Sequence, residues 1–375
     1  MSGPRDGPRR DRSALDGSAL DTPVLDADAH VIEPGEVFGP IVWDEVVDLP
    51  ATTPQVPCGD FELLADQFAH GFDAPSYLRA MDRQGIDGAV LYPSMGLFVP
   101  FQPELDGRAS ARACRAYNEW VAGYCATDAS RLAAVGVVPL VEVSLAVAEA
   151  QHAAALGLVG VLARPNHLYG RNLGDPEYDA LYDTLSGSGL VLAVHEGLGV
   201  RGPTLGSDRF SGFALRHLLS HPMEQMAALA SLFLEGALER HPSLRVAFLE
   251  SGTGWLPYWL ARLDDHHEWM ADSELVGLSL TPSEYFARQC VISCDPEDRL
   301  AGSTVESVGA DHVVWASDFP HPDAVFPGAL AETVADSGIG TADLPVVLWD
   351  TPLRFYDLAA RFGIAPPEPS GPETR

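Results

Sequence analysis

The chain has 375 residues, of which 46% are hydrophobic, so it can bury one large core or two modest ones. Its net charge is −30 at pH 7, which repels the phosphate backbone of nucleic acids and anionic lipid surfaces. All 23 basic residues are arginines, which excludes a lysine Schiff base and a carboxylated lysine that bridges two metal ions.

The N-terminal end of the chain is polar and rich in Pro, Gly and Asp, and the C-terminal end is polar and rich in Pro. The first 23 residues lack the apolar run that a signal peptide needs, and no window approaches the roughly 20 apolar residues of a membrane span. The five cysteines are irregularly spaced, which favours reduced thiols. We therefore expect disordered tails at 1–23 and 363–375, one catalytic domain at 24–362, and a cytoplasmic protein without membrane contact.

Short apolar runs alternate with amphipathic stretches along this domain. The eight strand-like runs are 24–30, 88–94, 132–140, 158–165, 189–197, 244–252, 290–296 and 312–321. Helical patterns lie between or after them, for example at 109–126, 144–157, 223–241 and 344–362. This alternation predicts an α/β fold, a (β/α)₈ TIM barrel, with a long insertion after the first strand, at 33–74, that could form a lid. A doubly wound open sheet is the alternative, but no Gly-rich phosphate turn follows the first strand.

Ionisable residues stand where several of these runs end. Asp28 and His30 end the first run, His195 and Glu196 the fifth, Glu250 the sixth and Asp318 the eighth. The C-terminal ends of barrel strands meet at one mouth, so these side chains should converge there. Asp26, one layer deeper, is better explained as a structural residue.

The convergence creates a charge problem. A single strand-end His or Asp is usually a cap or a loop anchor, but Asp28, Glu250 and Asp318 together carry a charge of about −3 that no Lys or Arg on these strands offsets. Divalent cations supply the missing positive charge. Two cations plus one hydroxide nearly cancel −3, which favours a dinuclear site, although protonation could also absorb charge.

Four motifs carry a family resemblance: DADAHVIEP at 26–34, His195, FLESGTGWLPYWLARLDDH at 248–266 and SDFPHPD at 317–323. Together they resemble the amidohydrolase-related superfamily, in its branch of the aminocarboxymuconate-semialdehyde decarboxylase type. The resemblance implies metal ligands at Asp28, His30, His195 and Asp318. It departs from the family pattern where Asp28 replaces a histidine, where Glu250 occupies the sixth-strand histidine position, and where Arg164 stands in place of a fourth-strand lysine.

These departures exchange nitrogen ligands for oxygen, which suits iron or manganese better than zinc. The chain, including HPMEQM at 221–226, is similar to a small branch of non-haem di-iron monooxygenases of diterpenoid antibiotic biosynthesis. The resemblance implies two iron ions, O₂ as co-substrate, an electron donor and a hydrophobic small-molecule substrate, with CoA as a candidate carrier. The alternative is a zinc- or manganese-dependent hydrolase or non-oxidative decarboxylase that acts on a small carboxylic acid.

Further residues have two interpretations each. His221 could bind the second metal or merely start a helix, Glu196 could assist the metal site or cap a loop, and His321 could act as a catalytic base or orient Asp323. A non-catalytic scaffold, a homo-oligomer and a CoA-phosphate site all stay open; the last would use the three arginines of the loop after the fifth run, Arg201, Arg209 and Arg216.

Overall fold

The computed structural model describes residues 22–38, 64–103, 105–197, 204–206, 209–321 and 324–364. The tails at 1–21 and 365–375, the part of the predicted lid at 39–63, and Arg201 lie outside the described residues.

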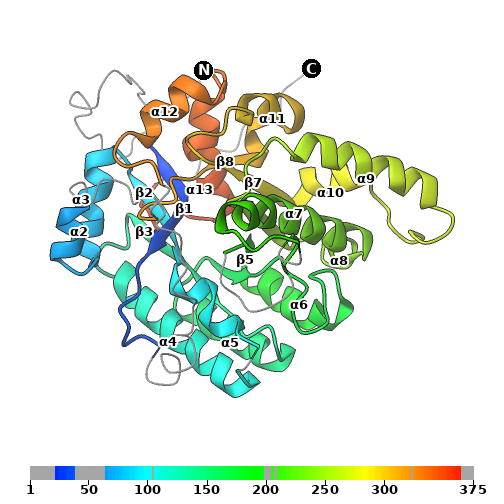
Figure 1. Cartoon of the computed structure of the whole chain (residues 1–375), viewed down its shortest axis with the longest axis horizontal. Coiled ribbons are helices and arrows are strands. Elements are labelled where there is room, and N and C mark those ends of the chain that lie inside the picture. The colour runs from blue at the N-terminus through cyan, green and yellow to red at the C-terminus, as the bar shows by residue number, and fades with distance from the viewer. Residues whose placement is uncertain are drawn as a thin grey trace.

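Eight parallel strands form the centre of the molecule, in the spatial order of the sequence (Figure 1). Each pairs in parallel with the next, from β1 with β2 through to β7 with β8. The predicted TIM barrel is confirmed. The strands are β1 Leu25–Val31, β2 Gly88–Pro93, β3 Leu132–Val137, β4 Gly160–Ala163, β5 Val191–His195, β6 Arg245–Leu249, β7 Cys290–Cys294 and β8 Val313–Trp315.

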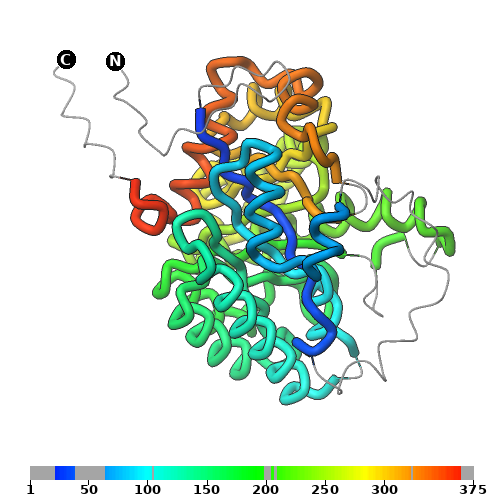
Figure 2. The backbone as a smooth tube through the Cα atoms, turned by 90° about the vertical axis from the view of Figure 1, so that its left-hand side faces the viewer, coloured from blue at the N-terminus to red at the C-terminus, as the bar shows by residue number. Residues whose placement is uncertain are grey.

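Helices surround the strands and cover the barrel, as the two perpendicular views show (Figures 1 and 2). They are α2 Ala65–Ala69, α3 Ala74–Gln84, α4 Gly107–Cys125, α5 Val143–Ala155, α6 Asp179–Ser188, α7 Phe213–Leu234, α8 Ala237–Arg240, α9 Leu256–Met270, α10 Pro282–Gln289, α11 Ala301–Val308, α12 Ala329–Asp336 and α13 Thr351–Phe355. Short helical turns include η1 Met95–Leu97 and η5 Val346–Asp350. No helix of the described ranges is both long and apolar enough to cross a membrane.

Burial explains why the strand runs are almost continuously apolar. Every residue of β1, β2, β5 and β7 is buried, because helices cover the outside of the barrel and side chains fill its inside. Ionisable residues of β1 and β5 are therefore removed from water even though they stand at the barrel mouth. Each needs a partner in the protein or a bound ion.

The barrel closes between β1 and the segment after β8. The amide of His30 donates to the carbonyl of Phe319 (2.8 Å), and the amide of Asp318 donates to the carbonyl of Asp28 (3.1 Å). Asp26 reinforces this closure, because its carboxylate accepts the hydroxyl of Ser317 and the Ser317 amide (3.1 Å). The closure thus fixes Asp28 and Asp318 relative to each other.

Two helical predictions need correction. The pattern at 223–241 was expected to begin after Pro222, but α7 begins at Phe213 and carries Pro222 inside it. Proline removes one intrahelical hydrogen bond but does not end this helix, whose buried residues lie at and after Ser220. The pattern at 344–362 is not one helix but the π-helical turn η5 followed by the short α13.

Candidate metal centre

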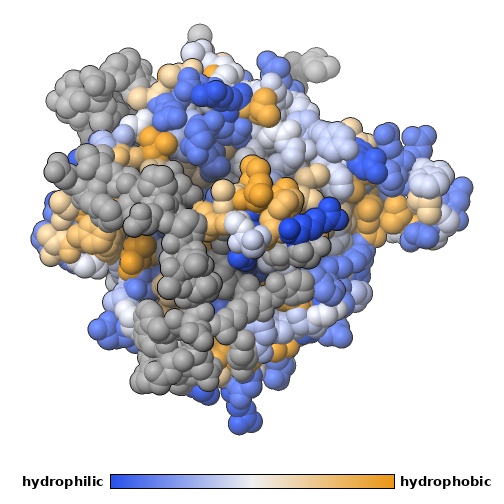
Figure 3. Space-filling view, viewed as in Figure 1, coloured by the Kyte–Doolittle hydropathy of each residue, from blue (hydrophilic) through white to orange (hydrophobic). Residues whose placement is uncertain are grey.

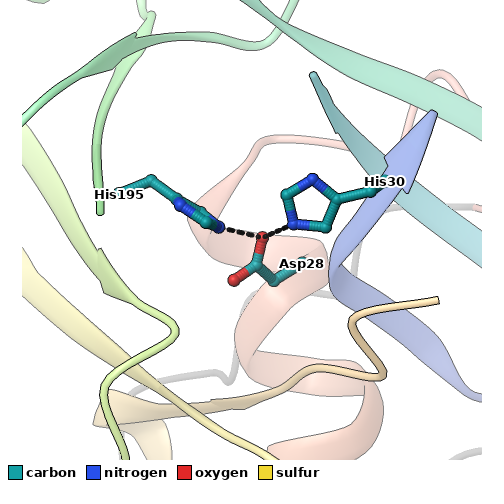
Figure 4. Close-up of side chains that lie close together, drawn as sticks. All are labelled: Asp28, His30 and His195. Atoms are coloured by element: carbon teal, nitrogen blue, oxygen red, sulfur yellow. Dashed lines mark ion pairs between the residues drawn. The ribbon is translucent and has the colours of Figure 1, made fainter. Parts of the chain in front are cut away.

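The ends of β1 and β5 bring three predicted ligands together. Asp28, His30 and His195 are buried, and their ligand atoms lie within 4.8 Å of one another. Asp28 Oδ1 lies 3.7 Å from His30 Nε2 and 3.5 Å from His195 Nε2 (Figure 4). Figure 4 shows the carboxylate between the two rings, which approach it from opposite sides of the barrel.

The other ring nitrogens fix the orientation of both histidines. His30 Nδ1 donates to the carbonyl of Pro93 (2.9 Å), and His195 Nδ1 donates to the carbonyl of Glu196. A carbonyl only accepts, so Nδ1 carries the proton and Nε2 presents a lone pair to the site. This is the arrangement by which proteins orient metal-binding histidines.

Metal binding is consistent with the free donor atoms. Asp28 Oδ1, His30 Nε2 and His195 Nε2 have no hydrogen-bond partner among the described residues. An oxygen and two nitrogen lone pairs that face one another repel unless a cation or a proton lies between them. Burial, together with His321 and His195, lowers the pKa of His30 well below its usual value, which disfavours the proton. The donor set therefore fits a divalent transition metal.

Asp318 and Glu250 extend this group on either side. His30 Nε2 lies 3.3 Å from Asp318 Oδ1, and His195 Nε2 lies 3.2 Å from Glu250 Oε2. Both carboxylates stand on residues with left-handed backbone, at φ 56° for Asp318 and 48° for Glu250. Such a conformation costs a non-glycine residue roughly 1–3 kcal/mol and concentrates at functional sites. The fold accepts this strain at both predicted ligands.

A second group of ligand atoms lies beside Glu250. His217, His221 and Glu250 have ligand atoms within 4.8 Å of one another, and His221 Nε2 is 3.5 Å from Glu250 Oε1. Burial, then the neighbours His217 and His195, lower the pKa of His221. His221 does not start a helix, as one interpretation held, but lies in the middle of α7, buried against the end of β6. Glu250 thus faces a histidine with each carboxylate oxygen.

Glu196 lies outside these groups and faces Arg164 instead. Arg164 Nη2 donates to Glu196 Oε1 (3.0 Å), and both side chains are only 1% exposed. Burial raises the pKa of Glu196 to about 7, while Arg164 opposes that rise. Arg164 thus pairs directly with Glu196, and its charge also acts on Glu250 of the metal group. A catalytic role for Glu196 stays a prediction.

His321 contacts the metal group directly. Its Nδ1 lies 2.7 Å from Asp318 Oδ1, its ring stacks on His30 with centroids 4.0 Å apart, and its Nε2 is 2.9 Å from Ser94 Oγ. Asp323, which His321 was alternatively expected to orient, lies outside the described residues. The catalytic role of His321 stays a prediction.

A cavity of about 270 Å³ opens onto the carboxylates of Glu250 and Asp318. Its ionisable lining residues are His217, His221, Glu250, Asp295, Glu297 and Asp318. Burial, followed by Glu297, Asp318 and Asp28, raises the pKa of Asp295 well above its usual value. Asp295 can therefore hold a proton that faces the cavity.

The amidohydrolase family model matches residues 25–358, which span the whole barrel. The chain belongs to the amidohydrolase family. A curated relative, 2-amino-3-carboxymuconate-6-semialdehyde decarboxylase of Dictyostelium discoideum, is 24% identical over 221 residues. That match covers 58% of this chain and 60% of the relative's length.

Solved structures of this amidohydrolase-family fold are similar over nearly the entire barrel. An amidohydrolase of Mycobacterium avium subsp. paratuberculosis has a TM-score of 0.73 and 21% identity, covering 90% of this chain and 100% of that one. 5-Carboxyvanillate decarboxylase of Sphingomonas paucimobilis has a TM-score of 0.71 and 21% identity, and the match covers 90% of this chain and 99% of that one. A dihydroxybenzoic acid decarboxylase of Polaromonas sp. JS666 was solved with manganese and an inhibitor. It has a TM-score of 0.66 and 17% identity, and the match covers 90% of this chain and 97% of that one. At these identities, the likeness establishes the fold.

Sequence reasoning missed three residues of this amidohydrolase-family site. Asp295 follows β7 as Glu250 follows β6, so the strand-end rule could have found it. His217 was missed because Pro222 was taken as the start of the helix, although the four-residue spacing from His221 places both on one helix face. Ser94 follows β2, and no sequence signal marks its contact with His321.

Proposed function

We infer that this chain is a metal-dependent enzyme that removes CO₂ from a carboxylic acid without oxidation. The observation that carries this proposal is the set of three buried donor atoms of Asp28, His30 and His195, which have no hydrogen-bond partner among the described residues. They lie next to Glu250 and Asp318, which line a cavity. The names of the relatives support the reaction, since three of the four proteins compared above are decarboxylases. One of those structures contains manganese, a metal that suits mixed oxygen and imidazole ligands.

Asp28, His30 and His195 would hold the metal, with Glu250 and Asp318 next to them. When bound, the cation acts as a Lewis acid that binds and polarises an oxygen of the substrate. The described residues lining the cavity include no arginine, so a cation held by Asp28, His30 and His195 would supply positive charge for a substrate carboxylate.

The chain's residues must then supply a proton. In decarboxylation, the bond between the substrate carbon and the carboxylate breaks, its electron pair stays on the carbon, and a proton replaces the departing CO₂. Asp295 is the group we assign to that proton, because it lines the cavity and its raised pKa favours the protonated carboxyl. Burial keeps bulk water away from Asp28, His30 and His195.

The rim of the cavity indicates an apolar part of the substrate. Leu218 lines the cavity and is 65% exposed, and four further hydrophobic side chains nearby in the sequence are also exposed, namely Leu205, Phe210, Leu215 and Met223. Figure 3 shows hydrophobic surface at the centre of the face where α7 begins, and Figure 2 shows that part of α7 extending from the barrel. We assign this rim to the body of a substrate that carries its carboxylate toward β1 and β5.

The experiment combines metal replacement with a carboxylic-acid panel. Metal-free protein is reloaded with Mn²⁺ or Zn²⁺ and mixed with aromatic and apolar carboxylic acids under nitrogen, and CO₂ release is measured. We expect CO₂ from the Mn²⁺ protein without oxygen and none from Asp28→Asn, whereas Asp272→Asn, an exposed control, retains the activity. Turnover that stops completely under nitrogen would refute this function.

A second function is favoured by one observation. Glu250 faces His195 with Oε2 and His221 with Oε1, so its carboxylate lies between two groups of ligand atoms. Carboxylates in this position hold the two metals of di-iron sites, which supports an iron-dependent monooxygenase. The same panel separates the two functions under ¹⁸O₂. Label in the product establishes oxygenation, and unlabelled product with released CO₂ excludes it.

A further inference from the structure

Ser94 forms a hydrogen bond to a residue of the metal group that comes from the opposite end of the domain. Its hydroxyl lies 2.9 Å from His321 Nε2, and His321 Nδ1 lies 2.7 Å from Asp318 Oδ1. Because a carboxylate only accepts, Nδ1 carries the proton, and Nε2 accepts from the Ser94 hydroxyl. The loop after β2 thereby sets the orientation of the His321 ring.

The backbone of Ser94 is itself fixed. The buried carboxylate of Glu33 accepts the amides of Ser94 (3.2 Å), Met95 (2.9 Å) and Gly96 (2.9 Å). Gly96 is required there, since a Cβ would lie 2.6 Å from Pro93 Cβ. These contacts join the loop after β1 to the loop after β2, which in turn holds the loop after β8.

The Ser–His–Asp order resembles a hydrolase triad, but the surroundings disfavour that chemistry. A nucleophilic serine needs free backbone amides to stabilise an oxyanion. The amides of Ser94, Met95 and Gly96 all point at Glu33. The serine hydroxyl therefore serves the histidine and not the substrate.

We propose that Ser94 is a positioning residue, which holds His321 so that His321 orients Asp318 and packs against His30 for metal binding. His321 contacts both predicted ligands, through the 2.7 Å contact with Asp318 and through the stack with His30 at 4.0 Å. Loss of such outer contacts typically weakens metal affinity about 10- to 100-fold. The inference rests on the proposed function only in requiring a metal at this site.

Mn²⁺ binding to metal-free protein tests the inference, with free Mn²⁺ followed by its EPR signal. We expect Ser94→Ala to raise the Kd for Mn²⁺ about 10-fold or more, and Ser94→Thr, which keeps the hydroxyl, to restore it. Ser110→Ala is the matched control, because its buried hydroxyl donates to the carbonyl of Pro100 (2.6 Å) and contacts Cys114, neither of which belongs to the metal group. That variant should lower thermal stability and leave Mn²⁺ affinity unchanged.

An unchanged Kd in Ser94→Ala would overturn the inference, as would a weakening equal to that of Ser110→Ala. A fluorophosphonate probe provides a second measurement: labelling of Ser94 would show a nucleophile and contradict the positioning role. None of these readouts needs turnover. If no carboxylic acid releases CO₂ while Ser94→Ala still weakens Mn²⁺ binding, the proposed function fails and the inference stands.

Discussion

Two aspartates of β1 show how surroundings separate chemically identical residues. Asp26 Oδ1 accepts the amides of Ser317 (3.1 Å) and Asp28 (3.3 Å), so its carboxyl ties the barrel closure together. Asp28 Oδ1 has no hydrogen-bond partner among the described residues and faces two histidines. Asp26 is therefore structural, as its deeper position predicted, while Asp28 remains available to a cation.

Asp26 makes folding depend on pH. Burial raises the pKa of Asp26 from 3.8 to about 8, despite the hydrogen bonds from Ser317 and Asp28. Between these values, the folded state keeps a proton that the unfolded chain has lost, so the free energy of unfolding falls as pH rises. The contribution is complete below about pH 4 and declines by at most about 1.4 kcal/mol per pH unit toward pH 8.

Asp26→Asn cannot titrate and should lack this slope. Urea unfolding of both proteins in EDTA at pH 5, 6, 7 and 8 should show wild type losing stability relative to the variant as pH rises. Asp272→Asn, at an exposed position, should follow wild type throughout. Parallel curves for wild type and Asp26→Asn would show that Asp26 does not hold the proton.

At the scale of elements, α7 is attached to the site by one glutamine. Gln225 Nε2 donates to the carbonyls of Val194 (2.8 Å) and Leu249 (2.9 Å), which immediately precede His195 and Glu250. One buried side chain thus sets the position of α7, and with it His221, relative to the ends of β5 and β6. Gln289 on α10 makes an equivalent pair of bonds away from the site, to the carbonyls of His241 (2.8 Å) and Leu244 (2.7 Å).

Replacing Gln225 or Gln289 by methionine should distinguish an effect on stability from an effect on metal binding. Both Gln225→Met and Gln289→Met remove two buried hydrogen bonds to backbone carbonyls, so we expect each to lose roughly 1–3 kcal/mol in urea unfolding. Gln225→Met alone should also raise the Kd for Mn²⁺, because β5 and β6 carry His195 and Glu250 to the site. Equal Mn²⁺ affinities in the two variants would show that the contacts of Gln225 on α7 do not affect metal binding.

The arrangement of strands and helices also explains which site residues could be predicted from the sequence. The positions of Asp28, His30, His195, Glu250 and Asp318 follow from one rule, that the ends of parallel strands meet at one mouth. The contacts of Ser94, His217 and Arg164 depend on how loops and helices pack onto the barrel, which local patterns do not encode. Pro222 was also misleading, because α7 continues through it although proline usually ends a helix.

At the scale of the whole molecule, charge acts in two ways. The chain has 53 acidic residues and 23 basic ones, so the folded surface repels itself wherever carboxylates lie within a screening length of about 8 Å at physiological salt. The metal group adds a local concentration of carboxylates at the barrel mouth. Any salt weakens the repulsion among surface carboxylates, whereas only a cation that binds to the metal group neutralises the carboxylates at the barrel mouth.

NaCl and MnCl₂ should therefore stabilise the protein through different residues. Raising NaCl from about 10 mM to about 150 mM should raise the Tm of wild type and of Asp28→Asn by a similar few degrees, because screening does not require Asp28. MnCl₂ at about 100 times its Kd, at constant ionic strength, should add about 2.7 kcal/mol to the stability of wild type only. Differential scanning fluorimetry measures both effects. A fall in Tm with NaCl would contradict the repulsion argument, and an equal response of both proteins to MnCl₂ would place the metal away from Asp28.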